Sequence, residues 1–461
     1  MAVFTPFEEV HQYILEKLEG SDICIGKRGS YLKVFQAALH YNINDLPNAK
    51  SGRNYFEKSK WVHGLYFLFQ ACKTRFARKV ALTPFILLDG SRFEGDEKRS
   101  VYFEKIKHWI GPHRCTHIAS MRQKPSSANY TTSEVENRFR VVDSLFYQQF
   151  QDVRLVYDKA KKSQRFTKDE LDYLGACLQS FLVRYSKCLA LYKHSSVVTV
   201  LFIVHYLNEG FIAAMQDLNI ACIELQHGLI SAADLYYVYD ERYRAWIQDA
   251  FFPKKMWVYG DLWEKRMRKG IASAQQKITV AGDYTLFFEK QSFTIPEKEN
   301  ILLICTQKFL AQDYFPWIDK ILSHLSHHPD WRVIIKLHPK EREHDVARYH
   351  EYASDKVEIM LQGDLSALFA KTKIQLSIYS TTFYDAIGYD VVNFTTDELQ
   401  TYHHYVQELT EEHIAKAIRL DDDPIEQFLL QHEYPFITRK SVYDQFPTAE
   451  LETWLAQHNA Q

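Results

Sequence analysis

A lysine and a histidine end an apolar run in the last third of the chain, within residues 336–339 (KLHP). The residues before them are typical of a buried strand, and the proline would stop that strand and hold a turn. An imidazole beside an ammonium group can hydrogen-bond and neutralise a phosphate. Lys336 and His338 are therefore candidate phosphate ligands, although a histidine at a strand end is also often a structural residue.

Three hydroxyl residues, Ser380, Thr381 and Thr382, follow a second apolar run in the same half of the chain. They precede a helix that we expect to start near Phe383, and hydroxyl side chains at such a position are typical N-caps. The same arrangement offers backbone N–H groups, hydroxyls and a favourable dipole to a phosphate. Together with His338, these residues favour an anion-binding site.

A third motif, Gln226-His227-Gly228, ends the apolar run at residues 220–225 (IACIEL). Its glycine allows a ligand to approach the backbone, or a positive φ, so Gln226 and Gly228 are candidate substrate contacts. His227 is a candidate general base for an acceptor hydroxyl, or a candidate ligand of a leaving phosphate. The alternative is a histidine whose hydrogen bonds are satisfied within the turn.

A fourth motif, residues 89–92 (DGSR), ends the apolar run at residues 80–88. The carboxylate of Asp89 is a candidate base for a hydroxyl, and the guanidinium of Arg92 is a candidate ligand of a substrate acid group. Asp-Gly is also a common turn, so the motif alone leaves both interpretations open.

The elements that must position these motifs are strands alternating with helices. In the first half we expect strands at residues 80–88, 197–204, 220–225, 255–259 and 277–280, and helices at about 133–192 and 209–218. In the second half we expect strands at 301–305, 331–337, 357–360, 374–378 and 391–394, and a helix at 315–327. Short apolar strands separated by helices predict doubly wound parallel sheets, which bind ligands at the carboxyl ends of their strands.

The length of 461 residues predicts more than one domain. We predict an α/β domain at residues 1–285 with extra helices, a second α/β domain at 286–425, and a helical segment at 426–461 that packs back on the first domain. The polar stretch at 290–300 is typical of a linker. The predicted fold is thus two doubly wound, Rossmann-like domains that face a central cleft.

Composition excludes several classes of protein. The formal charge of -2 gives no global field toward nucleic acid or an anionic membrane, and seven scattered cysteines without a CxxC pair indicate reduced thiols in the cytosol. The N-terminus is typical of an amphipathic helix, and the longest apolar stretch is too short to span a bilayer. We expect a cytoplasmic protein; the basic run at 73–79 leaves open a peripheral contact with the inner face of the membrane.

Motifs for the commonest nucleotide, metal and nucleophile sites do not occur. The chain has no Walker-type phosphate loop, no GxGxxG after a strand, no HExxH and no GxSxG. It also has no DxD-type acidic pair at a predicted strand end. We therefore expect chemistry that needs neither a metal nor a cofactor.

The order of the motifs resembles a group of bacterial GT-B glycosyltransferases that make capsule, teichoic acid and lipopolysaccharide structures. The group includes the capsule β-Kdo transferases, the CDP-glycerol glycerophosphotransferases and, more loosely, the bacterial sialyltransferases. The resemblance covers residues 197–394, with QHG, a Tyr-rich stretch, FP, strands that end at Gly260 and Gly282, then KLHP and STT. The first 190 residues carry no such resemblance.

The resemblance also implies roles for individual residues. In such families an HP motif and a hydroxyl-rich turn bind the donor phosphate, a role that falls here to His338, Ser380, Thr381 and Thr382. A glycine-adjacent histidine implies catalysis or phosphate handling by His227, and the base of the sialyltransferases matches Asp89. The chain departs from the sialyltransferases in two places: Leu88 replaces a second acid, and the turn reads Ser-Thr-Thr instead of paired serines.

The implied activity is transfer of a sugar from a nucleotide-activated donor, a CMP-sugar being favoured, to a bacterial surface glycan or a lipid-linked acceptor. Residues 1–285 would then be the acceptor side and residues 286–425 the donor-binding side. Direct displacement at the anomeric carbon would use a base for the acceptor proton and polar groups for the departing phosphate. Three alternatives stay open: a CDP-alditol phosphotransferase, a sugar-nucleotide 2-epimerase and a non-catalytic assembly protein.

Overall fold

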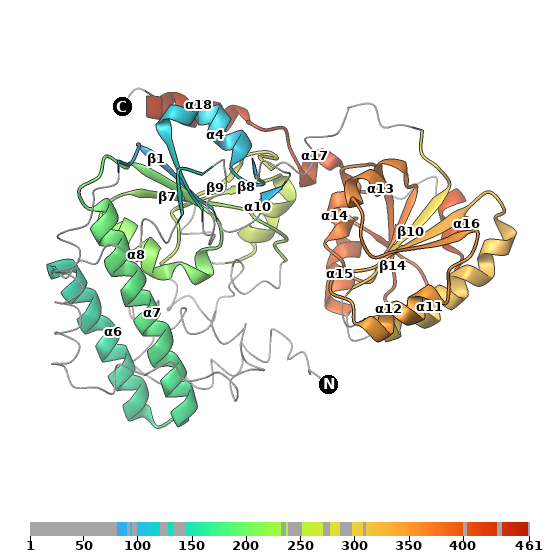
Figure 1. Ribbon diagram of the computed structural model, residues 1–461, viewed down its shortest axis with the longest axis horizontal. Coiled ribbons are helices and arrows are strands. Elements are labelled where there is room, and N and C mark those ends of the chain that lie inside the picture. The colour runs from blue at the N-terminus through green and yellow to red at the C-terminus, as the bar shows by residue number, and fades with distance from the viewer. Residues whose placement is uncertain are drawn as a thin grey trace. The chain divides into compact units, whose positions relative to one another are not determined.

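The computed structural model divides the chain into two compact units (Figure 1). Unit 1 comprises residues 1–259, 263–286 and 446–461, and unit 2 comprises residues 260–262 and 287–445. The structure describes residues 81–89, 93–94, 99–119, 128–131, 143–231, 237, 251–270, 277–285, 297–307, 310–399, 403–430 and 436–459. Arg92, the basic run at 73–79 and most of the predicted linker lie outside the described residues.

Unit 1 contains a sheet of seven parallel strands in the order β5-β4-β1-β6-β7-β8-β9. The strands are β1 (Phe85–Asp89), β4 (Cys115–Ala119), β5 (Tyr130–Thr131), β6 (Thr199–Phe202), β7 (Ala221–Leu225), β8 (Lys255–Val258) and β9 (Lys277–Val280). From β1 the chain first builds one edge of the sheet and then, from β6, the other. The strand order therefore reverses between β1 and β6, and at such a reversal doubly wound sheets bind their ligands.

A helical hairpin, formed by α6 and α7, covers part of this sheet. The helices of unit 1 are α4 (Glu104–Ile110), α6 (Ser144–Ser163), α7 (Lys168–Tyr192), α8 (Glu209–Asp217), α10 (Asp261–Arg268) and α18 (Ala449–Asn459), with 3-10 turns η4 (Pro112–Arg114) and η5 (His205–Leu207). A two-stranded hairpin joins β2 (Phe93–Glu94) to β3 (Arg99–Ser100). The helical stretch predicted at about 133–192 contains two helices, α6 and α7.

The break between α6 and α7 has a local cause. Gln164 ends α6 in the left-handed region at φ 55°. Thr167 then starts α7 with a capping box: its hydroxyl accepts from Glu170 N at 3.3 Å, and the Glu170 carboxylate accepts from Thr167 N at 2.6 Å. These bonds satisfy backbone donors that a continuous helix would have paired internally.

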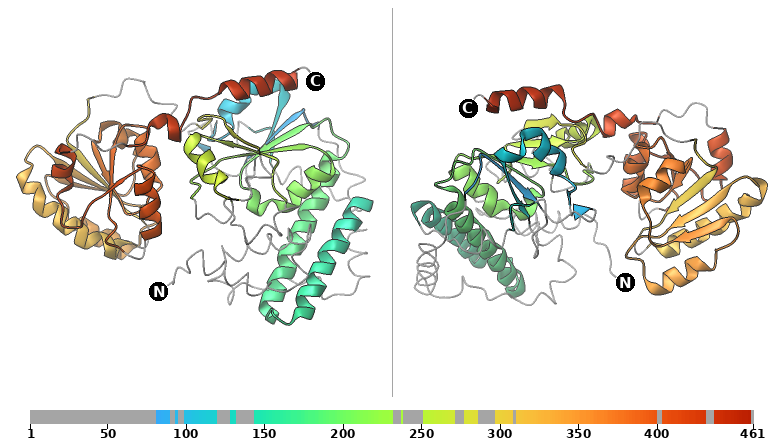
Figure 2. Two further views of the ribbon diagram at one scale, coloured as in Figure 1. Left: turned by 180° about the vertical axis from the view of Figure 1, so that it is seen from behind. Right: turned by 45° about the horizontal axis from the view of Figure 1, so that its top comes forward.

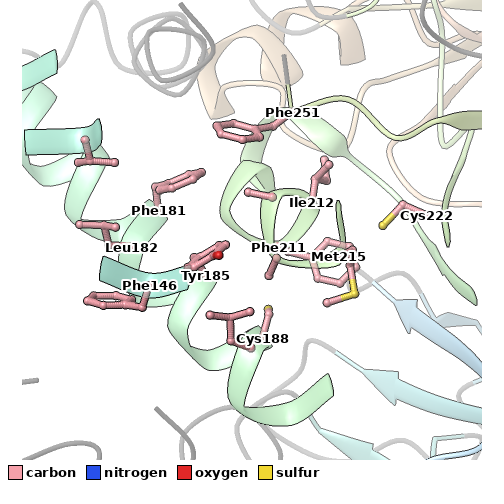
Figure 3. Packing of buried hydrophobic residues seen from close by; sticks show 14 of the residues in the cluster. Phe146, Phe181, Leu182, Tyr185, Cys188, Phe211, Ile212, Met215, Cys222 and Phe251 are labelled. Carbon is pink, nitrogen blue, oxygen red and sulfur yellow. The ribbon is translucent and has the colours of Figure 1, made fainter. Parts of the chain in front are cut away.

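Aromatic and aliphatic side chains of α6, α7 and α8 form the core on this side of the sheet (Figure 3). The ring centroids of Phe181 and Phe251 lie 5.2 Å apart, and Phe202 packs edge-on against Phe211 at the same distance. Gly210 lets α8 approach α7 closely, since a Cβ at this position would lie 2.4 Å from the carbonyl oxygen of Phe181. The helical hairpin is thus fixed to the sheet through α8.

The last helix of the chain packs on unit 1. Trp454 of α18 contacts Trp109 of α4 with ring centroids 6.1 Å apart, Trp257 of β8 at 5.2 Å and Phe85 of β1 at 6.0 Å. Figure 2 shows α18 alongside α4. Thr448 Oγ1 donates to the carbonyl of Val280 at 2.8 Å, so the segment is also bonded to the end of β9.

Unit 2 contains a sheet of six parallel strands in the order β12-β11-β10-β13-β14-β15. The strands are β10 (Ile301–Cys305), β11 (Arg332–Lys336), β12 (Val357–Met360), β13 (Ile374–Leu376), β14 (Val392–Thr395) and β15 (Lys416–Ala417). The helices are α11 (Ala311–His324), α12 (Glu343–His350), α13 (Leu365–Lys371), α14 (Thr382–Ile387), α15 (His403–Glu411), α16 (Pro424–Leu429) and α17 (Arg439–Val442), with the 3-10 turn η8 (Leu325–His327). Here the strand order reverses between β10 and β13.

The predicted fold class, two doubly wound parallel sheets in one chain, is confirmed by these topologies. The strands predicted from apolar runs are present within a few residues; β1, for example, starts after Pro84. Sequence analysis missed β4, β5 and β15, of which β4 carries two polar side chains, Thr116 and His117, and the others are two residues long. No helix among the described residues has both the length and the apolar character needed to cross a bilayer.

Candidate functional site

Four predicted site residues of unit 1 lie at the carboxyl edge of its sheet. Asp89 ends β1, and Gln226, His227 and Gly228 follow β7 directly. One strand, β6, separates β1 from β7. With neighbouring strands about 4.8 Å apart, the two strand ends lie about 10 Å apart across β6.

Three tyrosine hydroxyls hold the backbone of the Gln226-His227 turn. Tyr259 and Tyr284 both donate to the carbonyl oxygen of Gln226, at 2.7 and 2.8 Å, and Tyr102 donates to the carbonyl oxygen of His227 at 2.8 Å. Tyr284 is completely buried, and burial raises its pKa, so this hydroxyl stays protonated and remains a donor. The tyrosines therefore fix the turn from three different segments.

Gln226 holds the turn from within. Its side chain is fully buried; Oε1 accepts from Tyr259 N at 3.0 Å, and Nε2 donates to the Gly228 carbonyl at 2.9 Å. Gly228 does not have the positive φ that the sequence allowed. A Cβ at Gly228 would meet no atom within 4 Å, so the backbone there borders open space.

A buried histidine and a buried glutamate are linked to His227 through a tyrosine. The sequence analysis did not identify either of them. His205, which follows β6, donates from Nδ1 to Glu224 Oε2 at 2.7 Å, and its backbone N–H donates to Glu224 Oε1 at 3.0 Å. Tyr237 donates its hydroxyl to the same Oε1 at 3.0 Å, and that hydroxyl lies 3.5 Å from Nδ1 of His227. A chain of polar groups thus runs from His205 through Glu224 and Tyr237 to His227.

The charges of this chain act on the half-buried His227. Burial alone would raise the pKa of Glu224, but the charge and hydrogen bonds of His205 outweigh it and hold that pKa below its ordinary value. Burial lowers the pKa of His227, and the negative charge of Glu224 opposes this only in part. His227 is therefore neutral at neutral pH and can accept a proton.

The backbone before His205 is strained. Val204 has φ 63° and ψ 82°, in the left-handed region that β-branched residues rarely adopt. Asn208 holds this conformation by donating from its side-chain amide to the Val204 carbonyl at 2.7 Å. Such strain is concentrated at functional sites, and here it places His205 under the end of β7.

Asp89 is buried, at 1% exposure, and is bonded to two side chains. Its Oδ2 accepts from the Ser100 hydroxyl and lies 3.1 Å from Nε2 of the buried His117. Its Oδ1 has no hydrogen-bond partner among the described residues. Ser100 and Tyr102 lie two residues apart, so one short segment contacts both Asp89 and the backbone of His227.

In unit 2, two consecutive residues after β10 join the predicted phosphate motifs. Thr306 Oγ1 accepts from His338 N at 3.0 Å, and Gln307 Oε1 accepts from Tyr379 N at 3.0 Å. The loops after β11 and β13 are thereby held on either side of the end of β10. Sequence analysis missed Thr306 and Gln307, because a Thr-Gln pair after a strand carries no distinctive signal.

The orientation of His338 follows from a bond to its own loop. Its Nδ1 accepts from the backbone N–H of Lys340 at 3.0 Å, so the imidazole proton of the neutral ring resides on Nε2. Nε2–H is then a donor suited to a phosphate oxygen. Glu341 lies beside this loop; it accepts from the Thr306 hydroxyl at 2.8 Å, and burial raises its pKa despite that bond.

Lys336 is placed differently from His338. Its ammonium donates to the backbone carbonyls of Leu337 and Leu361, at 3.1 and 3.0 Å, and burial lowers its pKa. These carbonyls lie at the ends of β11 and β12, so the ammonium joins the two strand ends. The phosphate-binding role predicted for Lys336 stays a proposal. The contacts observed for its ammonium group are those with the two backbone carbonyls.

The side chains of the Ser380-Thr381-Thr382 turn take part in a chain of hydrogen bonds. Gln375 donates to Thr382 Oγ1, and the Thr382 hydroxyl donates to Ser380 Oγ at 2.9 Å. Ser380 Oγ also accepts from Thr382 N at 3.2 Å, so in both of these bonds it is the acceptor and its own O–H proton is not used. Thr381 precedes α14, is exposed and makes no side-chain capping bond.

A buried tyrosine supports the backbone before Ser380. Tyr314 donates to the Cys305 carbonyl at 2.9 Å, lies 2.9 Å from Ser377 Oγ and accepts from Ile378 N at 3.2 Å. Ser377 donates to the same carbonyl at 2.7 Å. The ends of β10 and β13 are thus joined at the point where the strand order reverses.

Comparisons with known proteins give distant structural similarities and no sequence match. No protein-family model matches the chain, and no curated protein matches its sequence. Among solved structures, the chain is similar to a UDP-GlcNAc 2-epimerase from Neisseria meningitidis with 11% identity, 81% of this chain and 100% of that chain covered, and a TM-score of 0.49.

Two further similar structures are described as a glycotransferase and as a trehalose 6-phosphate synthase. The glycotransferase of kitacinnamycin has 10% identity, coverage of 79% of this chain and 90% of that chain, and a TM-score of 0.41. The trehalose 6-phosphate synthase from Burkholderia multivorans has 10% identity, coverage of 82% and 98%, and a TM-score of 0.42.

Proposed function

We propose that this chain is a glycosyltransferase that moves a sugar from a nucleotide-activated donor to an acceptor hydroxyl. The observation that carries the proposal is the neutral His227, held at a strand end beside open backbone and backed by the buried Glu224 and Tyr237. A neutral imidazole near a substrate is suited to general-base catalysis. A phosphate leaving group also requires an anion-binding site, which we propose in unit 2.

In unit 2 the donor phosphate would be bound by His338 Nε2 and the Ser380 hydroxyl. Both are donors whose orientation is set by the hydrogen bonds behind them. Preorganised donors of this kind stabilise charge that develops on a departing phosphate. Thr382 contributes by orienting Ser380, and Thr381 is exposed next to it.

In the proposed reaction, the acceptor oxygen attacks the anomeric carbon of the donor while its proton passes to His227. The bond from the anomeric carbon to the phosphate oxygen breaks, and the nucleotide departs with the bonding electron pair. The proton taken by the imidazole is then released to solvent.

We propose His227 as the base in preference to Asp89. Asp89 is almost inaccessible and already bonded to Ser100 and His117, whereas His227 is half-buried beside an exposed glycine. Asp89 is then a positioning residue, which holds the segment that bonds the His227 backbone. Arg92 keeps its proposed role as a ligand of a substrate acid group.

The donor class and acceptor are proposals that rest on the resemblance of residues 197–394 to enzymes of bacterial surface glycans. A CMP-sugar is the favoured donor, and a lipid-linked or surface glycan is the favoured acceptor. The test is nucleotide release from CMP-, CDP-, UDP- and GDP-linked donors with a glycan acceptor. Product mass separates sugar transfer from alditol phosphate transfer, because CDP-alditol donors also release CMP.

Site variants test the residue assignments. We expect His227→Ala to lower kcat about 10²- to 10⁴-fold, the usual contribution of a general base. His338→Ala and Ser380→Ala should each weaken donor binding about 10- to 100-fold, as charge-assisted hydrogen bonds of about 1.5–3 kcal/mol imply. Calorimetry measures the binding, and steady-state rates measure kcat.

Exposed residues of the same types serve as controls: His108→Ala in unit 1, and His344→Ala and Ser323→Ala in unit 2. Unchanged donor binding in both unit 2 site variants would refute the phosphate site. Conversion of the donor to a C2 epimer without any acceptor would identify an epimerase instead. A chain that binds no nucleotide and turns over no donor would support the non-catalytic alternative.

A further inference from the structure

A cluster of three histidines faces an aspartate in unit 2, away from the residues discussed above. His324 ends α11, His327 ends the 3-10 turn η8, and His328 follows it. Asp423 precedes α16. One ligand atom each from His324, His327 and Asp423 lies within 4.8 Å of the other two.

The cluster lies at the amino end of the sheet. His328 is joined to the start of β11, because its carbonyl accepts from Trp331 N at 3.0 Å. His338 follows the opposite end of that five-residue strand, which spans about 16 Å. The cluster is therefore separate from the proposed phosphate site.

The ring of His324 is oriented as a metal ligand would be. Its Nε2 lies 3.2 Å from the carbonyl oxygen of Asp421, to which it donates, so the proton resides on Nε2. The lone pair is then on Nδ1, which lies 4.0 Å from Oδ2 of Asp423. Metal-binding histidines typically donate their other ring N–H to a carbonyl or carboxylate in this way.

The carboxylate of Asp423 is also held in place. Its Oδ1 accepts from Ile425 N and Glu426 N at 2.9 and 3.2 Å, which caps α16. Its Oδ2 lies 2.7 Å from Nε2 of His328. Asp423 is buried and His324 half-buried, whereas His327 is exposed and its side chain has room to move.

We propose that His324, His327 and Asp423 bind a divalent transition metal ion, for which Zn²⁺ is the natural probe. Two imidazoles and a carboxylate form a ligand set that suits zinc. Tetrahedral ligands at about 2.1 Å from zinc lie about 3.4 Å from one another, so the present atoms must close by roughly 1 Å. The exposed side chain of His327 can supply most of this movement, with His328 orienting the carboxylate.

Such an ion would join two segments that are distant in sequence, the end of α11 and the start of α16. At present the described contacts between them include the His328–Asp423 bond and an exposed pair, Lys320–Asp421, at 2.8 Å. Exposed pairs contribute little to stability. A bound ion would therefore stabilise unit 2 by mass action without taking part in sugar transfer.

The test is a Zn²⁺ titration of the full chain, free of any histidine tag and previously dialysed against chelator. We expect one ion per chain with a Kd near the micromolar range, and a rise in melting temperature on addition of Zn²⁺. Co²⁺ should give the visible absorption of a tetrahedral site. His327→Ala removes an exposed ligand without loss of core packing and should weaken binding at least 10-fold; His324→Ala should do the same.

His344→Ala, an exposed histidine beside Asp345, is the matched control and should bind as the unaltered chain does. Circular dichroism of each variant confirms that it is folded. The proposal is overturned if the full chain binds no Zn²⁺ under these conditions. It is equally overturned if folded His324→Ala and His327→Ala chains bind Zn²⁺ with unchanged affinity.

Discussion

Glu224 is the residue whose charge sets the behaviour of the proposed base. It lies within an apolar strand, is completely buried and receives bonds from His205 and Tyr237. A buried carboxylate is costly unless it is paired and hydrogen-bonded, and here it is both. Because Glu224 is completely buried, solvent and salt screen the electrostatic effect of its negative charge on His227 only weakly.

The pH dependence of activity follows from these charges. His227 must be neutral to accept a proton, so activity should rise with pH, with a midpoint below the ordinary histidine value of about 6.5. Replacement by Glu224→Gln removes the negative charge that favours the imidazolium, so the pKa of His227 should fall further. The acid limb of kcat/KM should therefore move to lower pH.

Glu264→Gln is the control for this profile, since Glu264 is paired with Arg268 on α10. It should leave the midpoint unchanged. An acid limb that stays in place or moves to higher pH in Glu224→Gln would show that His227 is not the titrating base. Measurement of kcat/KM in place of kcat reports the pKa of the free enzyme.

At the scale of elements, the contact between α7 and α8 depends on the absence of a side chain. Gly210→Ala would place a Cβ 2.4 Å from the Phe181 carbonyl oxygen, and the backbone of α7 cannot move without disturbing the core. We expect a loss of about 1–3 kcal/mol in the free energy of unfolding, the usual cost of overpacking. Thermal or denaturant unfolding measures it.

Gly228→Ala is the matched control, because its Cβ would meet no atom within 4 Å. Its stability should equal that of the unaltered chain within about 0.5 kcal/mol. Equal stabilities of the two variants would show that α8 can move away from α7 at little cost.

At the scale of the whole molecule, the chain returns to unit 1 for its last residues, 446–461. Trp454 fills the space among Phe85, Trp109 and Trp257. We expect Trp454→Ala to destabilise unit 1 by about 3–5 kcal/mol, as large-to-small changes of buried aromatic residues do. Calorimetry should show a lower transition for unit 1.

The control on the same helix is Gln457→Ala, an exposed position that should change little. Donor binding, which we propose for unit 2, provides a second readout. We expect it to persist in Trp454→Ala at temperatures below the lowered transition. A transition unchanged by Trp454→Ala would show that α18 contributes no stability to unit 1.

Most strands of both sheets were predictable, because strands covered on two faces must be apolar throughout. Thus β10 occupies the predicted residues 301–305, and β12 the predicted residues 357–360. By contrast, Thr116 and His117 interrupt the apolar pattern of β4, so the sequence did not predict that strand. His117 is tolerated there because it bonds Asp89, a residue distant in sequence.

By itself, the sequence determined the fold class and the strand ends that carry polar motifs, since both follow from local apolar patterns and turn residues. Only the tertiary structure decided which polar groups meet. The approach of His205 to Glu224, of Thr306 to His338 and of His324 to Asp423 depends on strand order and helix packing. Such contacts join residues far apart in the chain, and no local pattern encodes them.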